Sequence, residues 1–204
     1  MKRVLLFFLI PVLTVNAADD VKSKAGGMFS AGSRSTLSFF NHGESGNSGT
    51  GLGGQFRIQL SDKVNTEWFA DFITGNVGDF AIRTDYHIGW SVLYYLRPVS
   101  ATTQFLQPYV MAGHCFDYTR LQARGERHNF AERWSSAVQG GFGNHFNLSD
   151  HFDISASIQY MIHLGTDVDA TVKDHVVTFE KGKSANLEGH LLTTISLNYK
   201  LGNL

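Results

Sequence analysis

Residues 151–164 read HFDISASIQYMIHL, and apolar and polar side chains alternate along them almost without a break. Successive side chains of a β-strand point to opposite faces, so a period of two indicates a strand with one apolar and one polar face. We therefore predict a strand over these residues. The apolar face would carry Phe152, Ile154, Ala156, Ile158, Tyr160 and Ile162, and the polar face Asp153, Ser155, Ser157, Gln159 and His163.

The same alternation recurs along most of the chain. Together with residues 151–164 it predicts eight strands, each near the ~10 residues that cross a bilayer when tilted. No segment outside the N-terminus reaches the ~18 apolar residues of a spanning helix. The other predicted strands are residues 56–60, 64–72, 86–96 and 191–201, and, less regularly, 33–40, 105–118 and 134–148.

The predicted connections alternate in length. Short links are expected at residues 61–63, 97–104 and 149–151, and long polar links at 42–50, 74–82, 121–132 and 165–187. An up-and-down barrel in a membrane predicts this order, with short turns at one rim and long loops at the other. A soluble sandwich with crossover connections does not require it.

Composition narrows the function classes. The chain has 204 residues, of which 43% are hydrophobic and 17% charged, values that exclude a disordered protein. A formal net charge of −1 gives no electrostatic argument for a nucleic-acid partner. Cys115 is the single cysteine, which excludes an internal disulfide and a cysteine-based zinc cluster.

The N-terminus has the three parts of a secretory signal peptide. Lys2 and Arg3 precede an apolar run over residues 4–15, and Val15-Asn16-Ala17 places small residues before a polar continuation. We predict a signal peptide over residues 1–17, a flexible lead-in over 18–30 and a single barrel domain over 31–204.

A membrane barrel and a soluble barrel differ in the face that is turned outward. The apolar face is rich in Trp and Tyr, which collect at membrane interfaces, and the polar face carries small groups that fit a crowded lumen. Closing the sheet into a barrel also gives every backbone N–H and C=O a hydrogen-bond partner, which lipid cannot supply. We therefore predict an all-β fold, an eight-stranded antiparallel up-and-down transmembrane β-barrel with short periplasmic turns and long extracellular loops. A secreted soluble β-barrel that binds an apolar ligand is the alternative.

The turn at residues 61–63 fixes one register. It places Arg57 directly opposite Glu67, both facing inward, and the turn at 149–151 likewise places Asn147 opposite Asp153. Lys200 would reach Asp153 from the last strand. We interpret Arg57, Glu67, Asp153 and Lys200 as structural pairs of a packed polar lumen rather than as an ion path, and a barrel of eight strands leaves no open pore.

Three motifs resemble those of the small eight-stranded outer-membrane barrels of Gram-negative bacteria, the OmpA/OmpX-type superfamily. They are the Leu-Ser-Asp turns at 60–62 and 148–150, the Gln107-Pro108-Tyr109-Val110-Met111-Ala112-Gly113 strand and the closing segment 195–201. The chain departs from the pattern by ending in Leu204 instead of an aromatic residue. The resemblance implies the outer membrane as location. It implies outer-membrane lipid, lipopolysaccharide, the barrel-assembly machinery, periplasmic chaperones and a surface partner at the long loops as partners.

No residue pattern predicts a catalytic, cofactor or metal site. His87, His145, His163 and His190 are expected to fill the lumen, and His128, His151 and His175 to lie in loops or turns. A lipid A deacylase of this barrel type would need a serine two residues after His163, where Gly165 stands.

We therefore favour a non-enzymatic barrel with roles in envelope integrity, adhesion or partner contact. A lipid A-modifying enzyme is kept as the alternative. Residues 168–180 of the last long loop read either as a hairpin with an edge that is open to a partner strand or as a flexible solvated loop.

Overall fold

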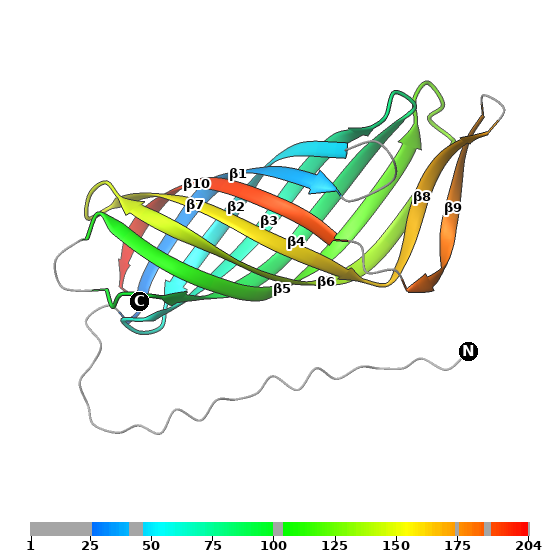
Figure 1. Ribbon diagram of the computed structural model, residues 1–204. Coiled ribbons are helices and arrows are strands. Elements are labelled where there is room, and N and C mark those ends of the chain that lie inside the picture. Colours follow the sequence, from blue (N-terminus) through cyan, green and yellow to red (C-terminus); the bar gives the residue numbers. More distant parts are fainter. Residues whose placement is uncertain (1–25, 41–46, 100–103, 174–175, 186–188, 204) are drawn as a thin grey trace.

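The computed structural model describes residues 26–40, 47–99, 104–173, 176–185 and 189–203 (Figure 1). The predicted signal peptide lies outside these residues, as does most of the predicted lead-in. None of the described residues belongs to a helix long and apolar enough to cross a membrane. The strands are β1 (Met28–Phe40), β2 (Asn47–Gln59), β3 (Val64–Val77), β4 (Ala81–Tyr95), β5 (Leu106–Ala123), β6 (Phe130–Asn147), β7 (Phe152–Leu164), β8 (Thr166–Lys173), β9 (Val176–Ala185) and β10 (Gly189–Asn203).

Eight of these strands form a closed antiparallel barrel in the order β1-β10-β7-β6-β5-β4-β3-β2. β8 and β9 pair only with each other and stand at one end of the barrel (Figure 1). We call this the hairpin end, and we call the opposite end, which carries the tight turns, the turn end. The predicted eight-stranded barrel is confirmed. Closure pairs each strand on both sides, so the sheet has no open edge in the hydrocarbon.

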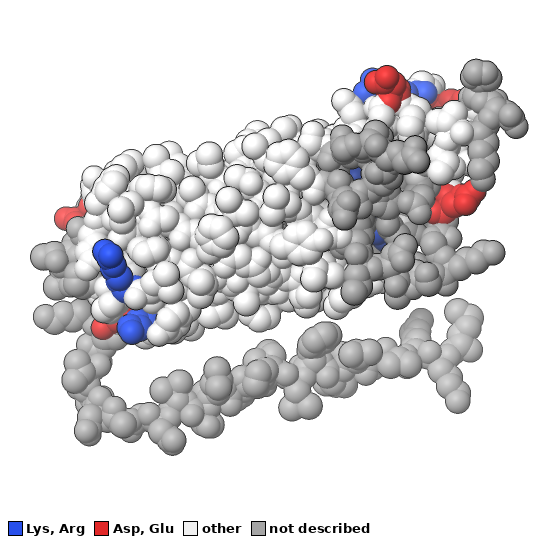
Figure 2. Space-filling view, viewed as in Figure 1, with Lys and Arg blue, Asp and Glu red and all other residues white. Residues whose placement is uncertain are grey.

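The wall turns its apolar face outward. On β7, Asp153 and Gln159 are buried, whereas Ile158 and Tyr160 are exposed, as the alternation predicts. Figure 2 shows a barrel wall without Lys, Arg, Asp or Glu across its middle, with the charged side chains gathered at the two ends. This is the reverse of a soluble barrel, whose outside is wet, so the secreted soluble alternative is wrong.

The two Leu-Ser-Asp segments make the same turn because they carry the same local hydrogen bonds. Leu60 N–H donates to the carbonyl of Val64 at 2.8 Å, and the hydroxyl of Ser61 accepts from Val64 N–H at 3.2 Å. At the second turn Leu148 donates to Phe152 at 2.9 Å, and Ser149 accepts from Phe152 at 3.0 Å. These turns fix the registers of β2 with β3 and of β6 with β7.

The inside-outside pattern reverses at the hairpin end. There the interior is apolar, while Arg124 donates to Asn76 at 2.7 Å on the outside and Arg120 lies 3.7 Å from Glu132. Such a pattern is typical of a surface in water, so this end extends beyond the apolar band of the wall. The interior cluster comprises Val77, Ala81, Leu121 and Val168, packed against Phe80, Ala131, Ala170 and Phe179.

The reversal explains why the predicted long loops were too long. Residues 74–82 were expected to form a loop, but β3 continues to Val77 and β4 begins at Ala81, with Gly78 at φ +53° in the turn. Polar residues outside and apolar residues inside do not fit a lipid-facing strand, yet they form a regular one in water. Similarly, β5 runs to Ala123, β6 starts at Phe130 and β2 starts at Asn47. At the other end β1 begins at Met28, within the predicted lead-in.

Candidate functional site

Arg57 of β2 organises the lumen near the turn end. Its Nη2 lies 2.5 Å from Oδ2 of Asp153 on β7, and both side chains are almost fully buried. Its Nη1 donates to the hydroxyl of Ser155 at 3.3 Å and lies 2.9 Å from Nδ1 of His145. Asn198 donates to Asp153 Oδ1 at 2.9 Å. We call these five residues the Arg57 cluster. Because β2 and β7 are not neighbours in the barrel, the Arg57–Asp153 pair crosses the lumen.

The sequence-predicted pairs are placed in register but are partnered differently. Arg57 lies opposite Glu67, as expected, yet Glu67 pairs with Arg34 at 3.3 Å while Arg57 extends to Asp153. Lys200 donates to Asn147 Oδ1 at 2.8 Å rather than to Asp153, although Asn147 is the register partner of Asp153. The side chains of the register partners Arg57 and Glu67 run parallel into the lumen and do not point at each other. The long side chain of Arg57 therefore reaches Asp153 on the other side of the lumen.

Arg34 of β1 forms a second ion-pair cluster, which is not among the pairs predicted from the sequence. Its Nε lies 3.0 Å from Asp71 Oδ1, its Nη1 lies 3.3 Å from Glu67 Oε1, and its guanidinium stands 4.4 Å from the centre of the Phe69 ring. The outward placement of Leu37 on the same strand could have identified Arg34, because residues three apart on a strand face opposite sides.

Asp117 of β5 is the centre of a third group, nearer the hairpin end. Its Oδ1 lies 3.2 Å from Nε2 of His87, and its Oδ2 lies 3.1 Å from Nδ1 of His163. Nε2 of His163 is 3.4 Å from Nδ1 of His190. Asp85 stands beside them on β4, where Arg83 Nε contacts its Oδ2 at 2.9 Å. We call Asp85, His87, Asp117, His163 and His190 the Asp117 cluster.

The four histidines predicted in the lumen are buried there, as expected: His87, His145, His163 and His190. His128 and His151 are exposed in connections, and His175 lies outside the described residues. His114 was not singled out from the sequence. It occupies the outer face, where its Nε2 lies 2.9 Å from the hydroxyl of Ser136 on β6.

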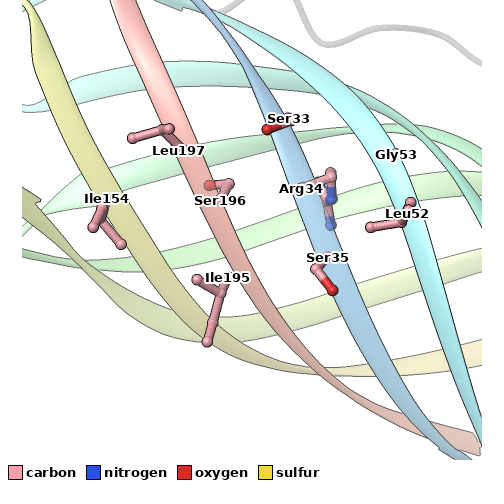
Figure 3. A pocket seen from close by; sticks show the side chains of 9 residues that line it. All are labelled: Ser33, Arg34, Ser35, Leu52, Gly53, Ile154, Ile195, Ser196 and Leu197. Atoms are coloured by element: carbon pink, nitrogen blue, oxygen red, sulfur yellow. The ribbon is translucent and has the colours of Figure 1, made fainter.

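The outer wall carries a shallow groove across β1, with a volume of about 520 Å³ (Figure 3). Ser33 and Ser35 form its floor, and larger apolar side chains from β2, β7 and β10 rise on both sides. The serines are small, so this strip of wall is lower than its surroundings. The apolar lining residues are Leu52, Ile154, Ile195 and Leu197.

The β8–β9 hairpin lies within the last predicted loop. Its strands pair in register from Val168 opposite Lys181 to Lys173 opposite Val176. Val168 packs into the apolar interior of the hairpin end, and Asn129 donates to the carbonyl of Val177 at 2.9 Å. The hairpin is therefore held against the barrel by an apolar contact and a hydrogen bond.

Comparisons with known proteins agree with this architecture. The sequence matches the family model described as outer membrane protein beta-barrel domain over residues 5–181. No curated protein matches the chain.

Several solved structures share the fold. Neisserial surface protein A is similar with a TM-score of 0.62 and 12% identity, over 85% of this chain and 97% of that chain. OprG from Pseudomonas aeruginosa gives a TM-score of 0.55 and 17% identity, over 90% of this chain and 100% of that chain. Ail, the attachment invasion locus protein of Yersinia pestis, gives a TM-score of 0.50 and 12% identity, over 85% of this chain and 97% of that chain. Identities this low establish a common fold.

Proposed function

The chain belongs to the outer membrane protein beta-barrel domain family, and on this premise we propose that it is a non-enzymatic barrel. We propose that its packed polar lumen does not conduct ions. We also propose that its hairpin end contacts partners or stabilises the envelope. Its place is the outer membrane. The cross-lumen pair between Arg57 and Asp153 carries the proposal, because a guanidinium and a carboxylate that meet in mid-lumen occupy the space a channel would need.

A closed lumen is supported by the number of strands and by the side chains that fill it. Eight strands enclose only enough space for side chains. The rings of Tyr109 and His145 contact each other near the turn end, with centres 4.5 Å apart and planes tilted by 33°, and Met161 and Leu192 are fully buried further along. Reconstitution in planar bilayers tests the proposal. We expect no stable conductance steps from the wild-type barrel, whereas uniform steps that scale with protein would contradict it.

Lipid contact is supported by aromatic residues that neighbour one another on the outer wall. One row on β3–β6 links Phe72, Tyr86, Tyr118 and Trp134 through ring contacts of 4.8–5.8 Å. Aromatic girdles of this kind flank the apolar band of membrane barrels. We propose outer-membrane lipid and lipopolysaccharide as the surroundings of the wall, and delivery of the chain by periplasmic chaperones to the barrel-assembly machinery.

The hairpin end is the proposed contact surface. Val172 and Val176 are exposed on either side of the β8–β9 connection, and a two-stranded sheet has outer edges to which a partner strand can be added. Replacing residues 166–185 by a short Gly-Ser linker leaves β7 and β10 paired directly. We expect this variant to assemble but to behave like a deletion strain in detergent sensitivity or surface attachment. Wild-type behaviour in both assays would contradict the proposal.

One observation favours a second candidate, an enzyme that acts on lipid A. The hydroxyl of Ser136 and the imidazole of His114 lie 2.9 Å apart on the lipid-facing wall, and a serine beside a base is the start of a nucleophilic site. Mass spectrometry of lipid A from cells with and without the protein separates the two candidates. Unchanged acyl chains support the non-enzymatic barrel. Acyl loss that requires both Ser136 and His114 would replace it with a deacylase.

A further inference from the structure

We propose that the Asp117 cluster is a binding site for one divalent transition-metal ion of the zinc type. Asp85, His87 and Asp117 each present a ligand atom, and these atoms lie within 4.8 Å of one another. All three side chains are fully buried. Two neighbouring strands supply them, because His87 is the register partner of Asp117 and Asp85 is two residues before His87 on the same face of β4.

His87 is the observation that points to a ligand. Neither of its ring nitrogens makes a hydrogen bond of acceptable geometry, although the ring is fully buried. Oδ1 of Asp117 likewise makes no hydrogen bond of that geometry. Its 3.2 Å contact with Nε2 of His87 is an ion pair when the imidazole is protonated, and the same two atoms can share a metal ion when it is neutral. Buried polar atoms are nearly always satisfied by a partner. A cation held by the imidazole and the carboxylate satisfies both groups at once.

Oδ2 of Asp117 and both oxygens of Asp85 already have hydrogen-bond partners. Asp117 Oδ2 accepts from the hydroxyls of Thr119 at 3.1 Å and Ser135 at 3.3 Å, and it contacts His163 at 3.1 Å. The hydroxyl of Thr119 also lies 2.7 Å from Asp85 Oδ1. Partners of this kind orient the ligands of a metal site.

The donor set and its surroundings select the type of ion. Calcium and magnesium take six or more oxygens, whereas zinc accepts four ligands and favours imidazole. Both carboxylates also face an arginine, since Arg83 contacts Asp85 at 2.9 Å and Arg133 lies 3.6 Å from Asp117. The two arginines make the site less negative than a calcium site. An ion that binds the imidazole nitrogen as well as carboxylate oxygens is therefore favoured.

Burial dictates when the ion binds. The ligands lie inside the closed barrel, so the ion enters while the strands close and leaves slowly afterwards. We propose to refold the full chain into lipid vesicles with Zn²⁺ or with a chelator, to remove free metal, and to measure bound zinc by mass spectrometry. We expect about one zinc per barrel after refolding with zinc, and at least a tenfold lower content when zinc is added to the finished barrel.

Variants locate the ion. His87→Gln and Asp117→Asn should each lower the zinc content at least tenfold, whereas His145→Gln, a lumen histidine of the Arg57 cluster, should leave it unchanged. Only variants that refold, judged by heat-modifiable migration, are compared. The wild-type chain supplies an independent reading, because zinc should shift the ring-nitrogen resonances of His87. Three results would each overturn the proposal. They are a wild-type content below about 0.1 zinc per barrel after refolding with zinc, full zinc retention by His87→Gln, and unshifted His87 resonances in the zinc-loaded barrel.

Discussion

Removing the charge of Arg57 tests whether the ion pairs of the lumen cross the barrel. Arg57→Met keeps the length of the side chain but leaves Asp153 buried without its 2.5 Å partner. Breaking a buried pair from one side costs about 3–5 kcal/mol, because an uncompensated charge remains. Lys200→Met removes a hydrogen bond to Asn147 from a half-buried position and should cost about 1 kcal/mol or less. Urea unfolding of refolded barrels in vesicles measures both values.

A double-mutant cycle separates the observed pair from the register pair. Arg57 and Asp153 are in contact, so combining Arg57→Met with Asp153→Asn should give a coupling energy of about 2–3 kcal/mol. The pairing of Glu67 with Arg34 predicts less than about 0.5 kcal/mol between Arg57→Met and Glu67→Gln. Equal couplings, or a larger one to Glu67, would refute the cross-lumen geometry. A cost below about 1 kcal/mol for Arg57→Met alone would show that water reaches Asp153.

Three further outcomes are expected from the same refolded barrels. Ile158→Arg on the outer wall should lower the free energy of unfolding in urea by about 2–4 kcal/mol. His151→Arg in the exposed turn should change this free energy little. Equal effects of the two variants would contradict the outward facing of Ile158. Met161→Ala should cost about 2–5 kcal/mol, because Met161 is fully buried, and a negligible cost would mean a hydrated lumen. Brominated lipids should quench Trp68 and Trp90, which are exposed on the wall, and unquenched fluorescence would place them away from lipid.

The alternation along β7 was enough to predict the strand and its two faces, and the aromatic residues of the apolar face indicated which face is turned toward lipid. The register of Arg57 with Glu67 followed from counting residues across the turn at 61–63. The inward facing of Arg34 follows in the same way from the outward facing of Leu37, three residues further along β1. The period of two therefore predicts which side chains enter the lumen.

The partners of those side chains were not predictable from the sequence. Arg57 and Asp153 are 96 residues apart and meet only because the barrel closes β1 against β10 and brings β7 across from β2. The ends of the strands were also misjudged, since residues 74–82 follow the pattern of a strand in water, with Val77 and Ala81 inside. Contacts across a lumen depend on its curvature, and one strand pair carries no information about curvature.

The charges inside the barrel show why the Asp117 cluster favours a cation. Among the described residues with buried side chains, the carboxylates of Glu67, Asp71, Asp85, Asp117 and Asp153 face the guanidinium groups of Arg34, Arg57, Arg83 and Arg133. Carboxylates exceed arginines by one. Asp153, Glu67, Asp71 and Asp85 each have an arginine within 3.3 Å, whereas the nearest basic groups to Asp117 are two imidazoles, with Arg133 at 3.6 Å. Glu67 and Asp71 share Arg34, whereas the negative charge of Asp117 has imidazoles as its nearest basic partners. A proton on an imidazole and a bound metal ion both offset it, and only the second leaves zinc in a barrel that was refolded with zinc.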